Sequence, residues 1–125
     1  HRVSRRQRQM CIRDRYLALS NTIRSALTTW GKTLSNEVAK SNITVNNILT
    51  GYFTTERLEQ LNSEKAKKMG VKVEEVFDAM KNQVPAKRIG NPKEFGYLAT
   101  FLSSDYASYI NGINIAIDGG LIKSL

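Results

Sequence analysis

A helical repeat of apolar residues dominates the first part of the hydrophobic pattern. Its members follow one another at spacings of four, three, four and four: Ile23, Leu27, Trp30, Leu34 and Val38. Residues three and four apart share one face of an α-helix, so this spacing predicts an amphipathic helix. Ser20 or Asn21 is the expected N-terminal cap, and the polar run 40–42 is expected to close the helix.

Two short apolar runs are predicted to form buried strands. Residues 43–49 (ITVNNIL) and 113–120 (INIAIDGG) are rich in β-branched side chains. Polar residues or glycines bound both runs. Gly51 is expected to end the first strand, and a glycine pair ends the second.

The segment between the two strands predicts three further helices. Helical stretches are expected near 55–67 and 73–82, with a break at Gly70, and their lysines and carboxylates are expected to form a solvated surface. Such a long excursion is often a lid or substrate loop. After a loop at 85–92, the third helix is expected to start at Pro92, with Asn91 as its cap and Glu94 in its first turn. Residues 105–112 are expected to form turns.

This order of elements is typical of an α/β fold with a parallel sheet. Two strands do not make a stable sheet alone, because parallel sheets need cover and neighbouring strands. We therefore expect residues 16–125 to be part of a larger domain.

The amino-acid composition limits the kinds of functional site that the chain can form. The chain has 125 residues, one Cys and one His, which fits one domain and excludes a disulfide framework and a His-based triad. No metal site is expected. No apolar run approaches the ~18 residues that span a bilayer, so we expect no membrane partner and a cytoplasmic location.

The basic charge is concentrated at one end. Residues 1–15 hold six arginines and one aspartate, so most of the net charge of +8 lies there and residues 16–125 give no reason to expect nucleic-acid binding. Three interpretations of this leader compete: a phosphate-binding arm, a transit peptide, or a segment that the gene does not encode. The run RRQRQMCIRDR resembles a translated sequencing adaptor, so a non-native or disordered leader is expected and Cys11 is assigned no role.

Three stretches resemble one enzyme family. PAKRIGNPKEFGYLATFLSSDYASYINGINIAIDGG is similar to the C-terminal signature of the short-chain dehydrogenase/reductase family. TVNNILTGYFTTERL resembles the family segment V-N-x-I-x-P-G-x-x-x-T, and SALTTWGKTLSNEVAKSNITVN resembles the helix after the active-site lysine. The resemblance covers residues 17–122 in the correct order, and the nearest subset is 3-oxoacyl-[acyl-carrier-protein] reductase-like.

The resemblance implies a doubly wound, Rossmann-type parallel sheet with helices on both faces, of which residues 16–125 form the C-terminal portion. It implies an oxidoreductase that uses NADP or NAD on a small carbonyl or alcohol substrate, as a homo-oligomer (dimer or tetramer). The Gly-rich phosphate-binding loop does not occur in this sequence, so the chain alone is expected to be inactive. The alternative is a non-catalytic member of the family that serves binding or oligomerisation.

The resemblance also places two candidate catalytic residues. The family's catalytic Tyr falls on Ser20 and its Lys on Arg24. Serine is a far weaker acid than a phenol, so Ser20 cannot simply replace it as proton donor, and a helix cap is the competing interpretation. Arg24 keeps the positive charge and could hydrogen-bond the nicotinamide ribose, or it could be a solvated helix charge. Tyr16 is the alternative phenol on the same helix face.

The loop after the first strand gives the remaining candidates. In the family a P-G turn places a backbone amide against the nicotinamide carboxamide, and a Thr further on contacts the carboxamide or a phosphate. These positions fall on Gly51, Phe53 and Thr55, with Thr50 in place of the Pro. Thr50 leaves φ less restricted than Pro does. Gly51 could equally be a plain turn residue, and both roles are compatible.

Overall fold

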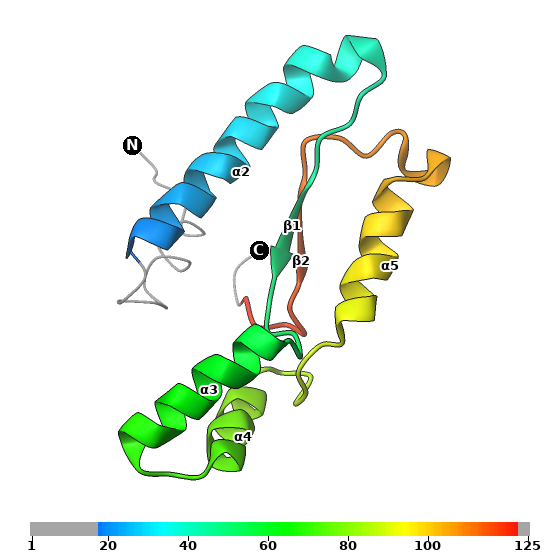
Figure 1. Ribbon diagram of the computed structural model, residues 1–125. Coiled ribbons are helices and arrows are strands. Elements are labelled where there is room, and N and C mark those ends of the chain that lie inside the picture. Colours follow the sequence, from blue (N-terminus) through cyan, green and yellow to red (C-terminus); the bar gives the residue numbers. More distant parts are fainter. Residues whose placement is uncertain (1–17, 123–125) are drawn as a thin grey trace. The chain divides into compact units, whose positions relative to one another are not determined.

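The computed structural model describes residues 18–122 (Figure 1). Within this range the first compact unit comprises residues 18–47 and 105–115, and the second comprises 48–104 and 116–122. The expectations for the leader, Cys11 and Tyr16 lie outside the described residues.

The long helix of the first unit is α2 (Ala18–Val38), followed by the 3-10 turn η1 (Ala39–Ser41). The predicted helix is confirmed, and Asn42 ends η1 in the left-handed conformation with φ 56°. The predicted cap is wrong, because Ser20 and Asn21 lie inside a helix that already includes Ala18. Ala18 and Leu19 are strong helix formers, so neither of them stops the helix before Ser20.

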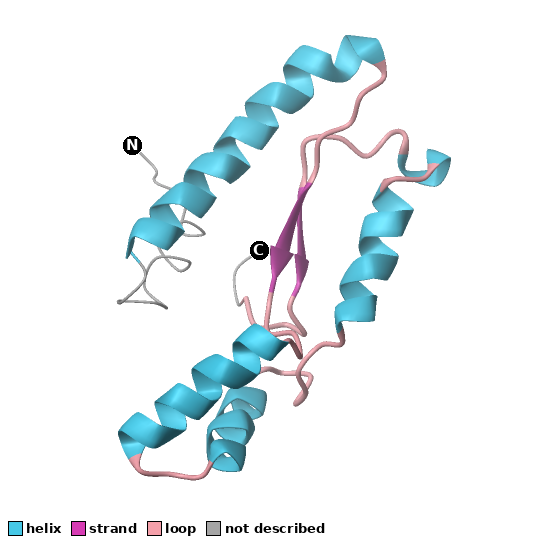
Figure 2. Ribbon diagram, viewed as in Figure 1, coloured by secondary structure: helices cyan, strands magenta, loops and turns pink. Residues whose placement is uncertain are grey.

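Strands β1 (Asn47–Thr50) and β2 (Asn114–Ile117) pair in parallel, as Figure 2 shows. The Asn47 N–H donates to the Ile113 carbonyl (2.9 Å), and four residues on the Gly51 N–H donates to the Ile117 carbonyl (3.0 Å). The parallel sheet is therefore confirmed, and so is the end of the first strand at Gly51. Both strands are shorter than predicted.

The predicted burial of the strands is wrong. Along β2 the residues alternate between exposed and half-buried, and no residue of β1 is fully buried. In the described part of the chain each strand pairs only with the other. A two-stranded sheet leaves much of each strand accessible, because burial of a parallel strand requires neighbours and covering helices.

The Asn111 side chain takes the place of a backbone partner for Val45, just before β1. Its amide oxygen accepts the Val45 N–H (2.8 Å), and its amide nitrogen donates to the Ser35 carbonyl in α2 (3.0 Å). One side chain thus satisfies backbone groups that lie 66 and 76 residues before it in the sequence.

Asn46 and Asn47 extend this use of amide side chains. Asn46 donates to the Ile110 carbonyl (2.8 Å) and accepts the Ile113 N–H (3.3 Å). Asn47 donates to the side chain of Asn114 (2.9 Å). The start of each strand is therefore held by side-chain hydrogen bonds as well as by the backbone bonds of the ladder.

In the second unit the two helices predicted near 55–67 and 73–82 are confirmed as α3 (Glu56–Met69) and α4 (Val73–Gln83). Gly70 separates them in the left-handed conformation, with φ 67°, which a residue without Cβ adopts at no steric cost. The buried apolar residues of this unit come largely from the two helices and the segments after them: Ala66, Val76, Met80, Val84 and Leu121. The lysines and carboxylates of both helices lie mostly in solvent, as predicted.

The last long helix is α5 (Pro92–Leu102), and its predicted start is confirmed. The Asn91 side chain accepts the Lys93 N–H (2.9 Å), while the Glu94 carboxylate accepts the Asn91 N–H (2.7 Å), which together form a capping box. The 3-10 turn η2 (Asp105–Ala107) lies in the predicted turn region. No helix in the described range combines the length and apolarity needed to cross a bilayer.

Candidate functional site

The candidate site lies in the second unit, where the two strands end. Gly51 follows β1 and Asp118 follows β2 directly. In open α/β sheets, ligands bind outside the carboxyl ends of parallel strands, which is where these residues lie. A Cβ built on Gly51 would stand 2.6 Å from the Asp118 Cα, so only glycine allows the two strand ends to approach this closely.

The loop after Gly51 is fixed by a parallel bridge to Gly90. The Gly90 N–H donates to the Tyr52 carbonyl and the Thr54 N–H donates to the Gly90 carbonyl, both at 2.9 Å. In a parallel bridge of this kind the residue between the two bonded ones directs its own N–H and C=O the other way. The Phe53 N–H therefore points away from Gly90, and it donates to no backbone carbonyl of residues 18–122.

The Phe53 side chain has a packing role. Its ring meets that of Phe95 edge to face, with ring centroids 6.3 Å apart. It also lies against Gly90, where an added Cβ would stand 2.9 Å from the Phe53 ring. Gly90 thus lets the ring approach, and the packed ring fixes the orientation of the backbone that carries the free N–H.

Thr55 caps the helix that follows. Its hydroxyl oxygen accepts the Leu58 N–H (3.3 Å), and its backbone is extended with φ −135°. A Thr at this position satisfies one of the unpaired donors of the first helical turn. Thr55 therefore sets the start of α3 four residues after Gly51, and the same hydroxyl lies at the positive end of the helix dipole.

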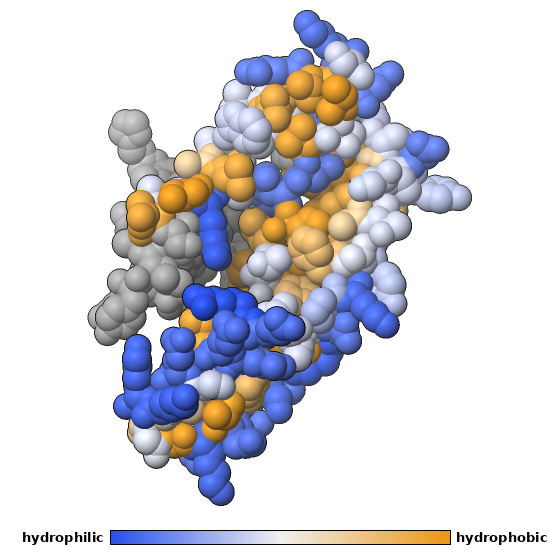
Figure 3. Space-filling model, viewed as in Figure 1, coloured by the Kyte–Doolittle hydropathy of each residue, from blue (hydrophilic) through white to orange (hydrophobic). Residues whose placement is uncertain are grey.

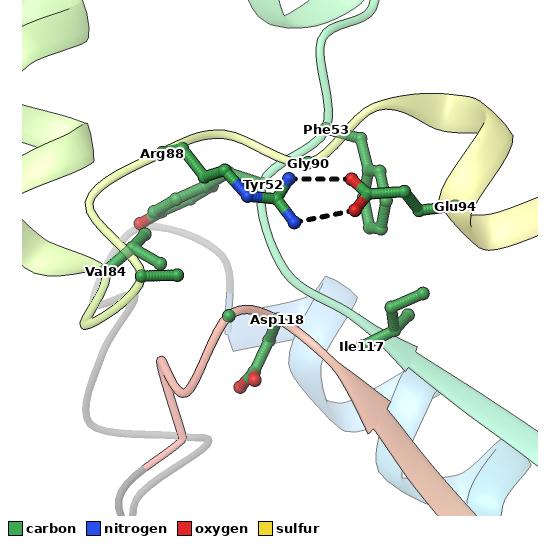
Figure 4. Close-up of a pocket in the computed structure, with 10 residues that line it drawn as sticks. Tyr52, Phe53, Val84, Arg88, Gly90, Glu94, Ile117 and Asp118 are labelled. Carbon is green, nitrogen blue, oxygen red and sulfur yellow. Dashed lines mark hydrogen bonds and ion pairs between the residues drawn. The ribbon is translucent and has the colours of Figure 1, made fainter.

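An ion pair that the sequence analysis did not anticipate borders this loop. The Arg88 guanidinium donates twice to the Glu94 carboxylate, at 2.8 and 2.6 Å (Figure 4). The hydrogen bonds from Arg88 and from the Asn91 N–H lower the pKa of Glu94 to about 2. The same hydrogen bond raises the pKa of Arg88. The sequence predicted Glu94 at the start of the helix, but its partner six residues earlier has no local signal.

Asp118 is the second site residue that sequence reasoning missed. Its carboxylate accepts the backbone N–H groups of Gly120 (2.9 Å) and Ile122 (2.7 Å), which closes the turn after β2. An Asp before a glycine pair is the available signal for such a turn. With Arg88, Glu94 and the loop at 52–53, Asp118 lines a hollow of about 90 Å³ (Figure 4). A hollow of this size holds a few waters, since each occupies about 30 Å³ of liquid.

The predicted residues fall into two groups. Gly51, Phe53 and Thr55 lie together in one loop of the second unit. Ser20 and Arg24 lie in α2, in the first unit, so the structure does not bring them into the same unit as the loop. Arg24 is exposed, and the side chain of Ser20 lies outside the described part. No group of three or more His, Cys, Asp or Glu side chains between residues 18 and 122 could hold a metal ion.

The sequence and fold can now be compared with those of known proteins. The family model described as Enoyl-(Acyl carrier protein) reductase matches residues 13–122. The chain is 35% identical over 106 residues to the NADPH-dependent reductase BacG of Bacillus subtilis, a match that covers 85% of this chain and 41% of BacG. The chain therefore spans about two fifths of the length of this relative.

Solved structures agree with the sequence comparison. A short chain dehydrogenase family protein from Francisella tularensis matches with a TM-score of 0.84 and 28% identity, over 92% of this chain and 48% of that one. L-sorbose reductase from Gluconobacter frateurii, solved with NADPH and L-sorbose, matches with a TM-score of 0.79 and 33% identity, over 84% and 40% of the two chains. The chain belongs to the short-chain dehydrogenase/reductase family, as its motifs predicted.

Proposed function

We propose that this chain is part of an NAD(P)-dependent oxidoreductase that reduces a carbonyl or oxidises an alcohol, with a substrate of the 3-oxoacyl type. The observation that carries this proposal is the Phe53 N–H, a donor just after the carboxyl end of β1 that has no partner among residues 18–122. Relatives support it, because BacG is named as an NADPH-dependent reductase and the sorbose reductase holds NADPH.

The loop residues fit the nicotinamide end of such a cofactor. The Phe53 N–H would donate to the carboxamide oxygen, and the close approach at Gly51 keeps the strand end free of a side chain. Thr55 would present its hydroxyl and the start of α3 to the carboxamide or to a phosphate. When bound, the nicotinamide supplies or accepts the hydride.

The resemblance gives two residues of α2 a role in the reaction. Arg24 would hold the nicotinamide ribose with its guanidinium fork, and its charge would favour the anionic form of a neighbouring hydroxyl. Ser20 is the hydroxyl at the proton donor's position, but its acidity is far below that of a phenol. We therefore propose that the chain by itself binds the nicotinamide end weakly and does not catalyse turnover.

Amide chemical shifts of the complete 125-residue chain test the cofactor site. Titration with reduced nicotinamide mononucleotide should shift the amide signals of residues 51–55, most of all that of Phe53. Adenosine monophosphate, which lacks the carboxamide, is the matched control ligand and should leave them unchanged. Equal shifts with both nucleotides, or no shift at Phe53, would contradict the proposed site.

A second candidate function rests on Ser20 and Arg24, onto which the resemblance places the family's Tyr and Lys. A family member without the phenol could use the fold for binding or oligomerisation alone. The complete protein distinguishes the two functions: turnover of NADPH with any ketone or alcohol in a panel supports the oxidoreductase. Binding of NADPH without turnover supports the non-catalytic member.

A further inference from the structure

The Arg88–Glu94 ion pair spans Gly90, the residue to which the loop after β1 is bonded. Both oxygens of the Glu94 carboxylate accept from the guanidinium: Oε1 accepts Nη2 at 2.6 Å, and Oε2 accepts Nη1 at 2.8 Å. Oε2 also accepts the Asn91 N–H at 2.7 Å. One carboxylate therefore binds the residue two positions before Gly90 and the residue directly after it.

Gly90 is the residue through which this segment holds the loop. Its N–H donates to the Tyr52 carbonyl, and its carbonyl accepts the Thr54 N–H, both at 2.9 Å. The Thr54 hydroxyl donates to the same carbonyl at 3.3 Å. These bonds hold the residues on both sides of Phe53, so the position of Gly90 sets the direction of the Phe53 N–H.

Gly90 does not keep its position through any conformational preference of its own. A glycine is required there because an added Cβ would stand 2.9 Å from the Phe53 ring, and glycine has the most accessible backbone conformations of any residue. In the described part of the chain, the backbone groups of Arg88 and Ile89 make no hydrogen bond to another backbone group. The Arg88 side chain supplies a restraint that this backbone lacks, because it reaches past Gly90 to Glu94.

The geometry of the ion pair favours a role in orientation over a role in stability. The Arg88 and Glu94 side chains keep 59% and 36% of their accessible surface, and solvent weakens the contribution of such exposed pairs to stability. A bidentate contact nevertheless fixes geometry, because the planar guanidinium and the carboxylate meet in two parallel hydrogen bonds. The pKa of Glu94, about 2, keeps its carboxylate ionised at neutral pH.

On the basis of the function proposed above, we propose that Arg88 and Glu94 are positioning residues for the Phe53 N–H. The ion pair restrains Gly90, and Gly90 holds the loop in the orientation that donates to the nicotinamide carboxamide. Both side chains line the same hollow as Phe53 (Figure 4). Their role is exerted through Gly90 and requires no contact with the cofactor.

Hydrogen exchange in the complete, ligand-free chain tests the restraint without the cofactor. Arg88→Met removes the donor groups, but Glu94 keeps its bond to the Asn91 N–H, so the start of α5 stays capped. We expect exchange of the Gly90 and Thr54 amides to become about threefold to fivefold faster, the factor that corresponds to the loss of an exposed ion pair.

Asp78→Asn is the matched control variant. It removes the Lys81–Asp78 ion pair, which is also exposed and belongs to the same unit. This pair lies on α4, and Figure 3 shows strongly hydrophilic residues over most of α3 and α4. Because the control pair does not span Gly90, exchange of the Gly90 and Thr54 amides should stay within about 1.5-fold of the unchanged chain.

Titration with reduced nicotinamide mononucleotide connects the restraint to the cofactor site. In Arg88→Met the affinity should fall by about threefold to fivefold. The shift of the Phe53 amide at saturation should also become smaller, because a hydrogen bond weakens when its donor is poorly aligned. A variant that only lowers stability changes the urea midpoint and leaves this saturated shift as it is.

A double-mutant cycle shows whether the two residues act as one unit. Glu94→Gln alone and the double variant Arg88→Met/Glu94→Gln should each lose about as much affinity as Arg88→Met, because the loss of either partner removes the same contact. Additive losses in the double variant would overturn the ion pair as the positioning unit.

The remaining outcomes separate the positioning role from the proposed function. Unchanged exchange at Gly90 and Thr54 in Arg88→Met, or an equal effect of Asp78→Asn, overturns the positioning role. Equal affinity and an equal Phe53 shift in all variants also overturn it, while the cofactor site stands. If the unchanged chain shows no shift at Phe53, the cofactor site is overturned, and faster exchange at Gly90 and Thr54 in Arg88→Met still supports the restraint of the loop by the ion pair.

Discussion

The interactions that stabilise the first unit differ in kind from those that stabilise the second. The second unit buries five apolar side chains, four of them in α3, in α4 or directly after α4. In the described part of the first unit, Ala107 is the buried apolar residue, and the buried polar residue is Ser35. There, side-chain hydrogen bonds of Asn46, Asn47 and Asn111 join segments that are far apart in sequence, beside backbone bonds of the strand pair.

This contrast shows how two parts of one fold can depend on different forces. The free energy gained by burying apolar side chains is roughly proportional to the area buried, so it changes little when the backbone shifts slightly. A hydrogen bond from a buried or half-buried amide depends on distance and angle, and a lost partner leaves an unpaired group behind. The apolar face of α2 contributes little burial, since Ile23, Leu27 and Trp30 each keep more than half of their surface exposed.

The largest effect is expected from truncating the apolar core of the second unit. Met80, 8% exposed, should cost about 3 kcal/mol of unfolding free energy when changed to alanine, because a cavity is left between packed helices. Urea unfolding followed by circular dichroism measures this. Met69→Ala is the control, because Met69 is 59% exposed and should change stability by less than about 0.5 kcal/mol. Equal effects of both changes would show that the second unit has no specific core.

Gly51→Ala tests the close approach of the strand ends. The new methyl group would meet the Asp118 backbone at 2.6 Å, so we expect a loss of about 2 kcal/mol and a shift of the Gly51 and Asp118 amide signals. Gly96→Ala is the matched control, because nothing lies within 4 Å of a Cβ there and it lies inside α5. It should stabilise the chain by about 0.5 to 1 kcal/mol.

Asn111→Ala tests the dependence of the first unit on amides. It removes the partners of the Val45 N–H and the Ser35 carbonyl, at an expected cost of about 1 to 2 kcal/mol. Hydrogen exchange at the Val45 amide should become faster. Asn82→Ala, an exposed position in α4, serves as the control and should be neutral or slightly stabilising. A neutral Asn111→Ala would mean that the amide bonds do not hold the first unit.

The smallest effect is expected from the exposed ion pair at the strand ends. The folded pKa of Glu94 is about 2, below its ordinary value of 4.5, so the ionised form stabilises the folded state. That contribution is present above pH 4.5 and is lost as the pH falls toward 2. In Glu94→Gln the urea midpoint should be lower than in the unchanged chain at pH 7. The difference between the two proteins should shrink between pH 4.5 and pH 2.

Local signals explain which elements the sequence could predict. The start of α5 follows from Asn91, Pro92 and Glu94, which lie within four residues, and the break at Gly70 follows from a single residue. The predicted helix cap at Ser20 was wrong because Ala18 and Leu19, which are strong helix formers, precede it in α2. Strand burial was wrong because it depends on neighbouring elements, which the apolar pattern of a strand does not contain.

In the candidate site, too, the sequence predicted only the features that depend on residues close together in the chain. Gly51, Phe53 and Thr55 lie together because they are almost contiguous in sequence, but the reason for Gly51 is the backbone of Asp118, 67 residues later. The Arg88–Glu94 pair and the bonds of Asn111 required the folded chain. The roles of Ser20 and Arg24 remain predictions, because they rest on the family resemblance alone.

The Asn111 contacts also affect how fast this asparagine deamidates. Asn111 precedes Gly112, and an asparagine followed by glycine readily deamidates: the glycine nitrogen attacks the side-chain amide carbon, ammonia leaves, and water then opens the cyclic imide to aspartate or isoaspartate. In the folded chain the Gly112 N–H is bound to the Val45 carbonyl (2.9 Å), and both ends of the Asn111 amide are held, so this reaction is suppressed. Each local unfolding of the first unit releases the Gly112 N–H and the Asn111 side-chain amide from these hydrogen bonds. The resulting aspartate has no N–H to donate to the Ser35 carbonyl, so the extent of deamidation in a stored sample records the time that this unit has spent open.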